Sequence, residues 1–137
     1  MKKQGTSCIF LNPQNEILLL LRDDKPAISF PNCWDIPGGR LEEGETPLEC
    51  IIREMQEELE RDVTNTTLFT KTEFTDRIEH TFWIRADFDA ATAPLHEGQR
   101  IQWFSEEEIG ALPTKMAFES DTIVGQFFRA LRAGQLE

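Results

Sequence analysis

Two short apolar segments near the start of the chain predict a pair of strands. Residues 6–11 and 16–22 are rich in aliphatic side chains, and the turn-forming residues 12–15 separate them. We therefore expect a β-hairpin. The unbroken run of aliphatic residues in the second segment is typical of a strand that is buried on both faces.

A long loop and a well-marked helix follow this hairpin. Residues 23–37 contain three prolines and predict a loop, and the two glycines that follow it predict a tight turn. Thr46 fits the N-cap of a helix, Pro47 fits its first position, and Glu49 completes a capping box. Apolar residues then recur at helical spacing as far as Leu59.

The second half of the chain reads as a meander of strands followed by helices. Strands are expected over residues 66–74, 79–88 and 100–104, a short helix over 106–112, and a final helix over 121–131. Runs of strands between helices, without regular alternation, predict an α+β fold. With 137 residues and no linker-like segment, we expect one domain over residues 1–137.

Charge and cysteine content restrict the function. The net charge of −11 argues against binding to nucleic acid polymers or to anionic membrane surfaces, because both require a basic face. The three cysteines show no metal-binding or disulfide spacing, which favours a reducing compartment. The longest aliphatic run is far below the ~20 residues of a membrane span, so we expect a cytoplasmic protein.

The predicted central helix carries a group of carboxylates on one face. At about 100° per residue, Glu54, Glu57 and Glu58 lie within about a third of a turn of one another. Like charges at this spacing repel, and a hard cation such as Mg²⁺, which prefers oxygen ligands, would relieve the repulsion. A solvated acidic helix face is the alternative that the helix alone cannot exclude.

The spacing around these carboxylates resembles the Nudix box. Gly39, Glu45 after five residues, and the run from Arg53 to Glu58 after seven more match the pattern G-x5-E-x7-R-E-U-x-E-E, and Pro37-Gly38 is the usual lead-in. The resemblance implies a Nudix-type α/β/α sandwich with a mixed central sheet. It also implies hydrolysis of a nucleoside diphosphate linked to another group, dependent on Mg²⁺ with Mn²⁺ as an alternative.

The resemblance assigns roles residue by residue. It implies metal binding by the carbonyl of Gly38 and by the carboxylates of the helix and of a later loop, and it implies catalytic roles for four side chains. Gly39 and Glu45 would support the structure of the box. The implied metal ligands are Gly38, Glu54, Glu57, Glu58 and Glu97, and the implied catalytic residues are Arg53, Glu57, Glu58 and Glu97. Which glutamate acts as the general base is left open.

Cationic and aromatic residues outside the box are candidates for substrate binding. By the same resemblance, Arg22, at the end of the second strand, stands where an arginine contacts phosphates in the MutT-like members, and Lys25 and Arg40 are weaker candidates. Trp34, in the long loop, is expected to stack on a nucleobase, with Asn32 and Asp35 beside it able to read the base edge.

One position departs from the Nudix pattern. The box normally ends with a glycine and an aliphatic residue, and here Glu60 and Arg61 occupy those places. Because that glycine usually ends the helix in a left-handed conformation, we expect the helix to run on towards Val63.

A nucleoside triphosphate, oxidised or not, is the leading substrate, cleaved to the monophosphate and pyrophosphate. The alternatives are a nucleotide-sugar or non-nucleotide pyrophosphate hydrolase, and a nucleotide-binding regulator without catalysis. The absence of tyrosine from the chain argues against the diadenosine-polyphosphate members of the family. The resemblance leaves a homodimer open.

Overall fold

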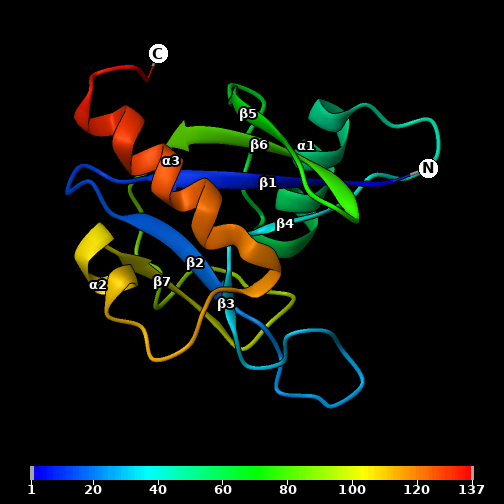
Figure 1. Ribbon diagram of the computed structural model, residues 1–137, viewed down its shortest axis with the longest axis horizontal. Helices are drawn as coiled ribbons and strands as arrows, with labels where there is room; N and C mark the ends of the chain where they lie inside the picture. Colours follow the sequence, from blue (N-terminus) through cyan, green and yellow to red (C-terminus); the bar gives the residue numbers. More distant parts are fainter. Residues whose placement is uncertain (1, 137) are drawn as a thin grey trace.

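The protein consists of a mixed β-sheet with helices on both faces (Figure 1). The computed structural model describes residues 2–136. The elements follow one another as β1 (Lys3–Leu11), β2 (Ile17–Leu21), β3 (Trp34–Asp35), β4 (Gly38–Arg40), α1 (Pro47–Leu59), β5 (Thr67–Glu73), β6 (Arg77–Arg85), β7 (Arg100–Phe104), α2 (Glu106–Gly110), η1 (Ala117–Glu119) and α3 (Ser120–Arg132).

The sheet is built around β1 and β2. Its main path runs β3-β2-β1-β6-β5, while β4 pairs with β1 and β7 pairs with β2. β1 and β6 are parallel along their full length and the other pairings are antiparallel. The predicted hairpin of β1 and β2 is confirmed, and so is the prediction of a mixed sheet.

Alternate side chains of β1 and β2 face two separate cores. Cys8 and Phe10 pack with α1 on one face, and Ile9 and Leu11 pack with α3 on the other. The aliphatic run of β2 divides in the same way and is buried on both faces, as the sequence predicts. Figure 1 shows the two helices on opposite sides of the sheet, so the predicted sandwich is confirmed.

The predicted tight turn at Gly38 and Gly39 is wrong. These residues form β4, which pairs antiparallel with β1 through Thr6↔Gly39 and Ser7↔Gly38. The long predicted loop also ends early, because Trp34 pairs with β2 as part of β3. Glycine signals a tight turn and a close approach of two backbones equally well, and only the sheet decides between them.

The two ends of α1 differ in how well the sequence predicts them. The capping box of Thr46 and Glu49 forms as expected, with Thr46 Oγ1 accepting from the Glu49 amide at 3.1 Å. The predicted extension of the helix beyond Leu59 is wrong. Glu60 itself takes the left-handed conformation, with φ of 53°, and ends the helix there.

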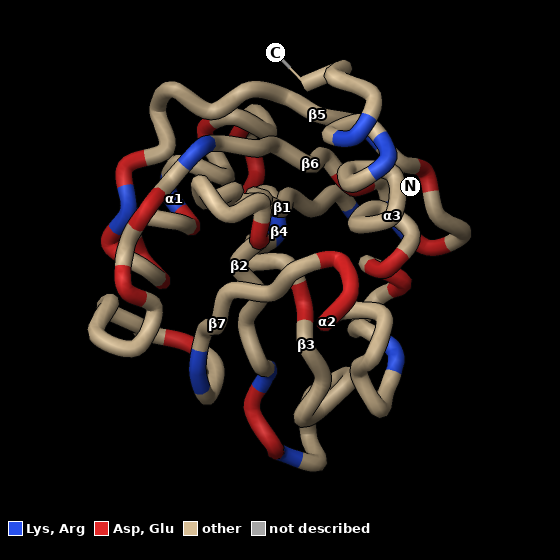
Figure 2. Tube along the Cα trace, turned by 90° about the vertical axis from the view of Figure 1, so that its left-hand side faces the viewer, with Lys and Arg blue, Asp and Glu red and all other residues tan. Residues whose placement is uncertain are grey.

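Charge is distributed unevenly along the fold. Figure 2 shows acidic positions outnumbering basic ones along the trace, with several of them on α1 and in the loops around it. Among residues 2–136, no helix is both long enough and apolar enough to cross a lipid bilayer.

The left-handed Glu60 generates a stability prediction. A left-handed residue with a side chain costs about 1–2 kcal/mol, whereas glycine adopts the same conformation freely. We expect Glu60→Gly to exceed Glu60→Ala in free energy of unfolding by about 1 kcal/mol, measured by urea denaturation. Both variants lose the side-chain contact with His96 at 2.6 Å, so the pair isolates the backbone effect. Equal stabilities would show that Glu60 is not strained.

Candidate active site

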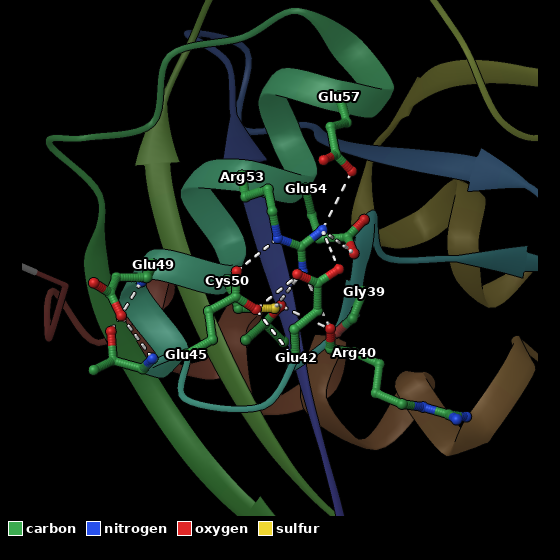
Figure 3. A network of polar contacts seen from close by, with 11 residues as sticks. Gly39, Arg40, Glu42, Glu45, Glu49, Cys50, Arg53, Glu54 and Glu57 are labelled. Carbon is green, nitrogen blue, oxygen red and sulfur yellow. Dashed lines mark hydrogen bonds and ion pairs between the residues drawn. The ribbon is translucent and has the colours of Figure 1, made fainter.

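Arg53 is the centre of a network of carboxylates on α1 and the loop before it (Figure 3). Its guanidinium donates to both oxygens of Glu45, at 2.6 and 3.0 Å, and to Glu54 at 3.1 Å and Glu57 at 3.2 Å. The bidentate hydrogen bond from Arg53 lowers the pKa of Glu45 to about 2. Arg53 Nη2 also donates to the Arg40 carbonyl at 3.3 Å, which ties α1 to β4.

The two glycines of β4 allow α1 to lie against the sheet. A Cβ atom on Gly38 would come within 1.9 Å of the Thr6 carbonyl oxygen, and one on Gly39 within 2.1 Å of Glu54 Cδ. Real Cβ atoms make no such contacts, so a side chain at Gly38 would have to displace backbone, whereas one at Gly39 would have to displace the Glu54 side chain. The absence of a side chain at Gly38 allows β4 to pair closely with β1, and the absence of one at Gly39 leaves room for the Glu54 carboxylate.

Glu58 has an unusual environment for a carboxylate. The residue is 6% exposed, and its Oε2 atom is buried without a hydrogen-bond partner among residues 2–136. Burial, followed by the hydrogen bond with Glu54 and the charges of Glu97, Glu54 and Glu57, raises the pKa of Glu58 to about 10. An unpartnered buried carboxylate oxygen is costly unless a cation or a donor binds it.

The loop that carries Glu97 is fixed at both ends. The His96 amide donates to the Glu58 carbonyl at 2.8 Å, and the Gln99 amide donates to the Leu21 carbonyl at 2.8 Å. Between them, Gly98 has φ of +85°, and a Cβ there would come within 2.9 Å of the Leu21 carbonyl oxygen. Burial, followed by the charge of Glu54, raises the pKa of Glu97.

These groups open into one cavity of about 590 Å³. We group its lining residues by the elements that carry them. The group on α1, β4 and the Glu97 loop, which we call the carboxylate end, contains Glu54, Glu58, Glu97, Gly38 and Gly39. A second group, which we call the far end, comes from β3, β6, η1 and α3. The residues of the far end that matter below are Asp35, Arg77, Glu79, Phe118 and Ser120.

Arg22 also lines the cavity. Its positive charge lowers the pKa of both Glu97 and Asp35, against the larger effect of burial on each. Arg22 Nε donates to the Ser29 carbonyl at 3.0 Å, and its guanidinium lies over the Phe118 ring at 4.9 Å. A cation in this position can contact an anionic ligand that spans the cavity.

Two buried acids belong to the far end. Burial and, to a smaller extent, the charge of Glu79 raise the pKa of Asp35 to about 7, although a hydrogen bond from Ser120 Oγ at 2.7 Å acts in the opposite direction. Burial also raises the pKa of Glu79, whose side chain is 13% exposed and contacts Arg77 Nε at 3.4 Å. Arg77 Nη2 donates to the Phe118 carbonyl at 2.6 Å and so links β6 to η1.

Most of the residues singled out in the sequence come together around this cavity, but three kinds of exception occur. Glu57 is 60% exposed and contacts Arg53 outside the cavity. Arg53 and Glu45 do not line the cavity, but Arg53 binds both Glu45 and the cavity residue Glu54. Trp34 is half-buried, packs edge-to-face on Phe104 at 4.7 Å and does not line this cavity, so its predicted stacking on a base stays a prediction. The predicted site residues that line the cavity are Arg22, Asp35, Gly38, Gly39, Arg40, Glu54, Glu58 and Glu97.

Sequence reasoning missed four residues of the far end. Arg77 and Glu79 reach the cavity because β6 runs parallel to β1, and Phe118 and Ser120 reach it through η1 and the start of α3. No local motif marks these positions. The carboxylate end could be predicted because Glu54 and Glu58 belong to one helix, where they form part of a motif with a recognisable spacing. Glu97 is found through its resemblance to a loop of the same family.

No three His, Cys, Asp or Glu side chains within residues 2–136 are gathered as a complete metal-binding shell. The donor set nevertheless fits a hard divalent cation, because carboxylate oxygens line the carboxylate end and one of them, Glu58 Oε2, has no partner there. The residues that could hold such a cation are Glu54, Glu58 and Glu97, with the Gly38 carbonyl.

Comparisons with known proteins agree with this geometry. A NUDIX domain model matches residues 1–127. The chain is 35% identical over 100 residues to an 8-oxo-dGTP diphosphatase of Escherichia coli, covering 71% of this chain and 75% of that protein. It is 33% identical over 105 residues to a CTP pyrophosphohydrolase of the same organism, covering 74% and 75%.

Solved structures show the same architecture. A MutT protein from Methanosarcina mazei superposes with a TM-score of 0.72 at 21% identity, over 93% of this chain and 94% of that one. At this identity the likeness concerns the fold. With the matched domain spanning nearly the whole chain, and with the box residues gathered as described, the chain belongs to the Nudix family of pyrophosphohydrolases and has the Nudix fold.

Proposed function

We propose that this chain hydrolyses a nucleoside triphosphate to the monophosphate and pyrophosphate, with Mg²⁺ as its cofactor. The observation that carries the proposal is the cavity of about 590 Å³, which is lined by the carboxylates of Glu54, Glu58 and Glu97 and by the guanidinium of Arg22. A triphosphate chain needs both cationic neutralisation and space for a base beyond it. The names of the two Escherichia coli relatives support a nucleoside triphosphate as the substrate class.

The carboxylate end has the composition that a divalent cation requires. When bound, such a cation neutralises phosphate oxygens and lowers the pKa of a water molecule. Glu58 offers a buried oxygen without another partner, and Glu54 is held in place by Arg53 at 3.1 Å. Arg53 thus acts as a positioning residue, since it orients a ligand and does not itself line the cavity.

The chain's own residues have separable roles in the proposed reaction. Arg22 would bind the phosphate chain within the cavity. Water attacks a phosphorus atom, the phosphoanhydride bond breaks, and pyrophosphate leaves with the bond electrons. The proton of the water passes to a carboxylate, for which Glu58 and Glu97 are the candidates that line the cavity.

A product-release assay tests the proposal. Purified protein with Mg²⁺ is incubated with canonical and oxidised nucleoside triphosphates, nucleotide sugars and dinucleotides, and pyrophosphate and orthophosphate are measured separately. We expect pyrophosphate from a triphosphate, and its loss with EDTA. Turnover of a nucleotide sugar alone would contradict the triphosphate as substrate and indicate a nucleotide-sugar hydrolase. Binding without turnover of any compound would indicate a regulator without catalysis.

Replacing the buried glutamate should remove activity without unfolding the protein. We expect Glu58→Gln to lower kcat at least about 100-fold, because the amide cannot act as an anionic ligand or accept the proton. The melting temperature should stay close to that of the wild type, since a neutral amide suits the buried position. Glu43→Gln, an exposed acid in the loop before α1, is the matched control. Near-normal kcat in Glu58→Gln would exclude Glu58 from the site.

The two neighbouring glycines should respond differently to alanine. Gly38→Ala drives a Cβ into the Thr6 backbone and should destabilise the fold by about 3 kcal/mol. Gly39→Ala meets the Glu54 side chain, which can move, so we expect a folded protein with roughly 10-fold weaker Mg²⁺ binding. Thermal denaturation and calorimetric titration measure the two effects. Unchanged Mg²⁺ affinity in Gly39→Ala would show that the position of Glu54 does not matter for binding.

A further inference from the structure

A buried pair of polar side chains joins α1 to β1 beside the carboxylate end of the cavity. Thr6 and Cys50 are 3% and 0% exposed, and the distance from Thr6 Oγ1 to Cys50 Sγ is 3.2 Å. Thr6 Oγ1 also donates to the Gly39 carbonyl of β4 at 3.2 Å. Because a carbonyl only accepts and the hydroxyl has a single proton, the thiol is the donor to Thr6. The hydrogen bonds therefore run in one direction, from Cys50 through Thr6 to Gly39.

The same thiol contacts the arginine at the centre of the carboxylate network. Arg53 Nη2 donates to Cys50 Sγ at 3.9 Å and to the Arg40 carbonyl at 3.3 Å (Figure 3). Two consecutive carbonyls of β4 are thus held from α1. The Arg40 carbonyl is held directly by Arg53, and the Gly39 carbonyl is held through Cys50 and Thr6. Since β4 has only three residues, these two contacts restrain how the strand lies against the helix.

We propose that Thr6 and Cys50 are positioning residues for the metal-binding groups of the carboxylate end. This inference rests on the proposed function, because it concerns the same Mg²⁺ site. A Cβ on Gly39 would come within 2.1 Å of Glu54 Cδ, so the Glu54 side chain lies directly against the backbone that Thr6 holds. Gly38 precedes Gly39 in β4, so a shift of this strand would move both the Gly38 carbonyl and the backbone that supports Glu54.

Packing alone does not require a polar pair at this position. Buried polar groups are costly unless they are hydrogen-bonded, and two apolar side chains of similar size would fill the same space without this demand. Hydrogen bonds have preferred directions, so they fix the orientation of the groups that they join. The box pattern specifies neither Thr6 nor Cys50, and only the pairing of β1 with β4 beneath α1 brings the two residues together.

Calorimetric titration of the whole protein with Mg²⁺, without nucleotide, tests the proposal independently of turnover. Thr6→Val keeps the shape of the side chain and removes the hydroxyl, and we expect it to raise the Kd for Mg²⁺ about tenfold. Thr6→Ser keeps the hydroxyl and should stay within about twofold of the wild type. Cys50→Ala removes the thiol but leaves the hydrogen bond from Thr6 to Gly39, so we expect a smaller increase of about threefold.

Thr81→Val is the matched control. Thr81 is 0% exposed and shares a hydroxyl pair with Ser7 at 2.9 Å, and neither of them is among the described residues that line the cavity. We expect this variant to lower the melting temperature about as much as Thr6→Val and to leave the Kd for Mg²⁺ unchanged. A wild-type Kd in Thr6→Val, or an equal rise of the Kd in Thr81→Val, would reduce the pair to a structural contact and overturn the proposal.

The outcomes separate this inference from the function on which it rests. Weaker Mg²⁺ binding in Thr6→Val that Thr6→Ser restores supports the inference even if no triphosphate is hydrolysed. Hydrolysis of a triphosphate together with an unchanged Kd in Thr6→Val overturns the inference and leaves the function in place. If Thr6→Val does not fold, Cys50→Ala decides in the same way, since an unchanged Kd there overturns the inference. A wild-type protein that binds no Mg²⁺ contradicts both.

Discussion

The close packing of α1 against β4, locked by one guanidinium, is the constraint on which the site depends. Arg53 satisfies Glu45 with two hydrogen bonds, reaches Glu54 and Glu57, and binds the Arg40 carbonyl of β4. Without a cation among them, these carboxylates would repel one another and weaken the helix. Because the side chain of Arg53 is anchored at so many points, the helix keeps its acidic face directed at the glycine strand. The same contact that stabilises the fold therefore also orients a candidate ligand.

The cavity is lined by both acidic and basic side chains. Arg22 and Arg77 line it together with the carboxylates, and the charge of Arg22 lowers the pKa of both Glu97 and Asp35. An acidic protein can thus attract a polyanionic ligand through local arrangement, although its net charge of −11 opposes it.

Several residues are held in positive-φ conformations around this cavity. Glu60 ends α1 beside the Glu97 loop, Gly98 turns that loop against β2, and Phe118 with Glu119 turns the chain into α3. Such conformations lower the stability of a protein and persist where the surroundings fix them. Phe118 lines the cavity, and Gly98 and Glu119 are next in sequence to the lining residues Glu97 and Ser120. These unfavourable backbone conformations therefore orient residues that line the cavity.

The sequence by itself determined the elements whose signals are local. The hairpin of β1 and β2, the capping box of α1 and the spacing of the box carboxylates all depend on residues within a few positions of one another, so pattern and propensity suffice. Only the tertiary structure decided that Gly38 and Gly39 form a strand, that Glu60 ends the helix, and that Trp34 packs edge-to-face on Phe104 against the core. It alone decided the far end too, because Asp35, Glu79 and Ser120 lie on three elements that meet through sheet pairing and the packing of α3. Contacts between residues so distant in sequence leave no periodic or spaced signal in a single chain.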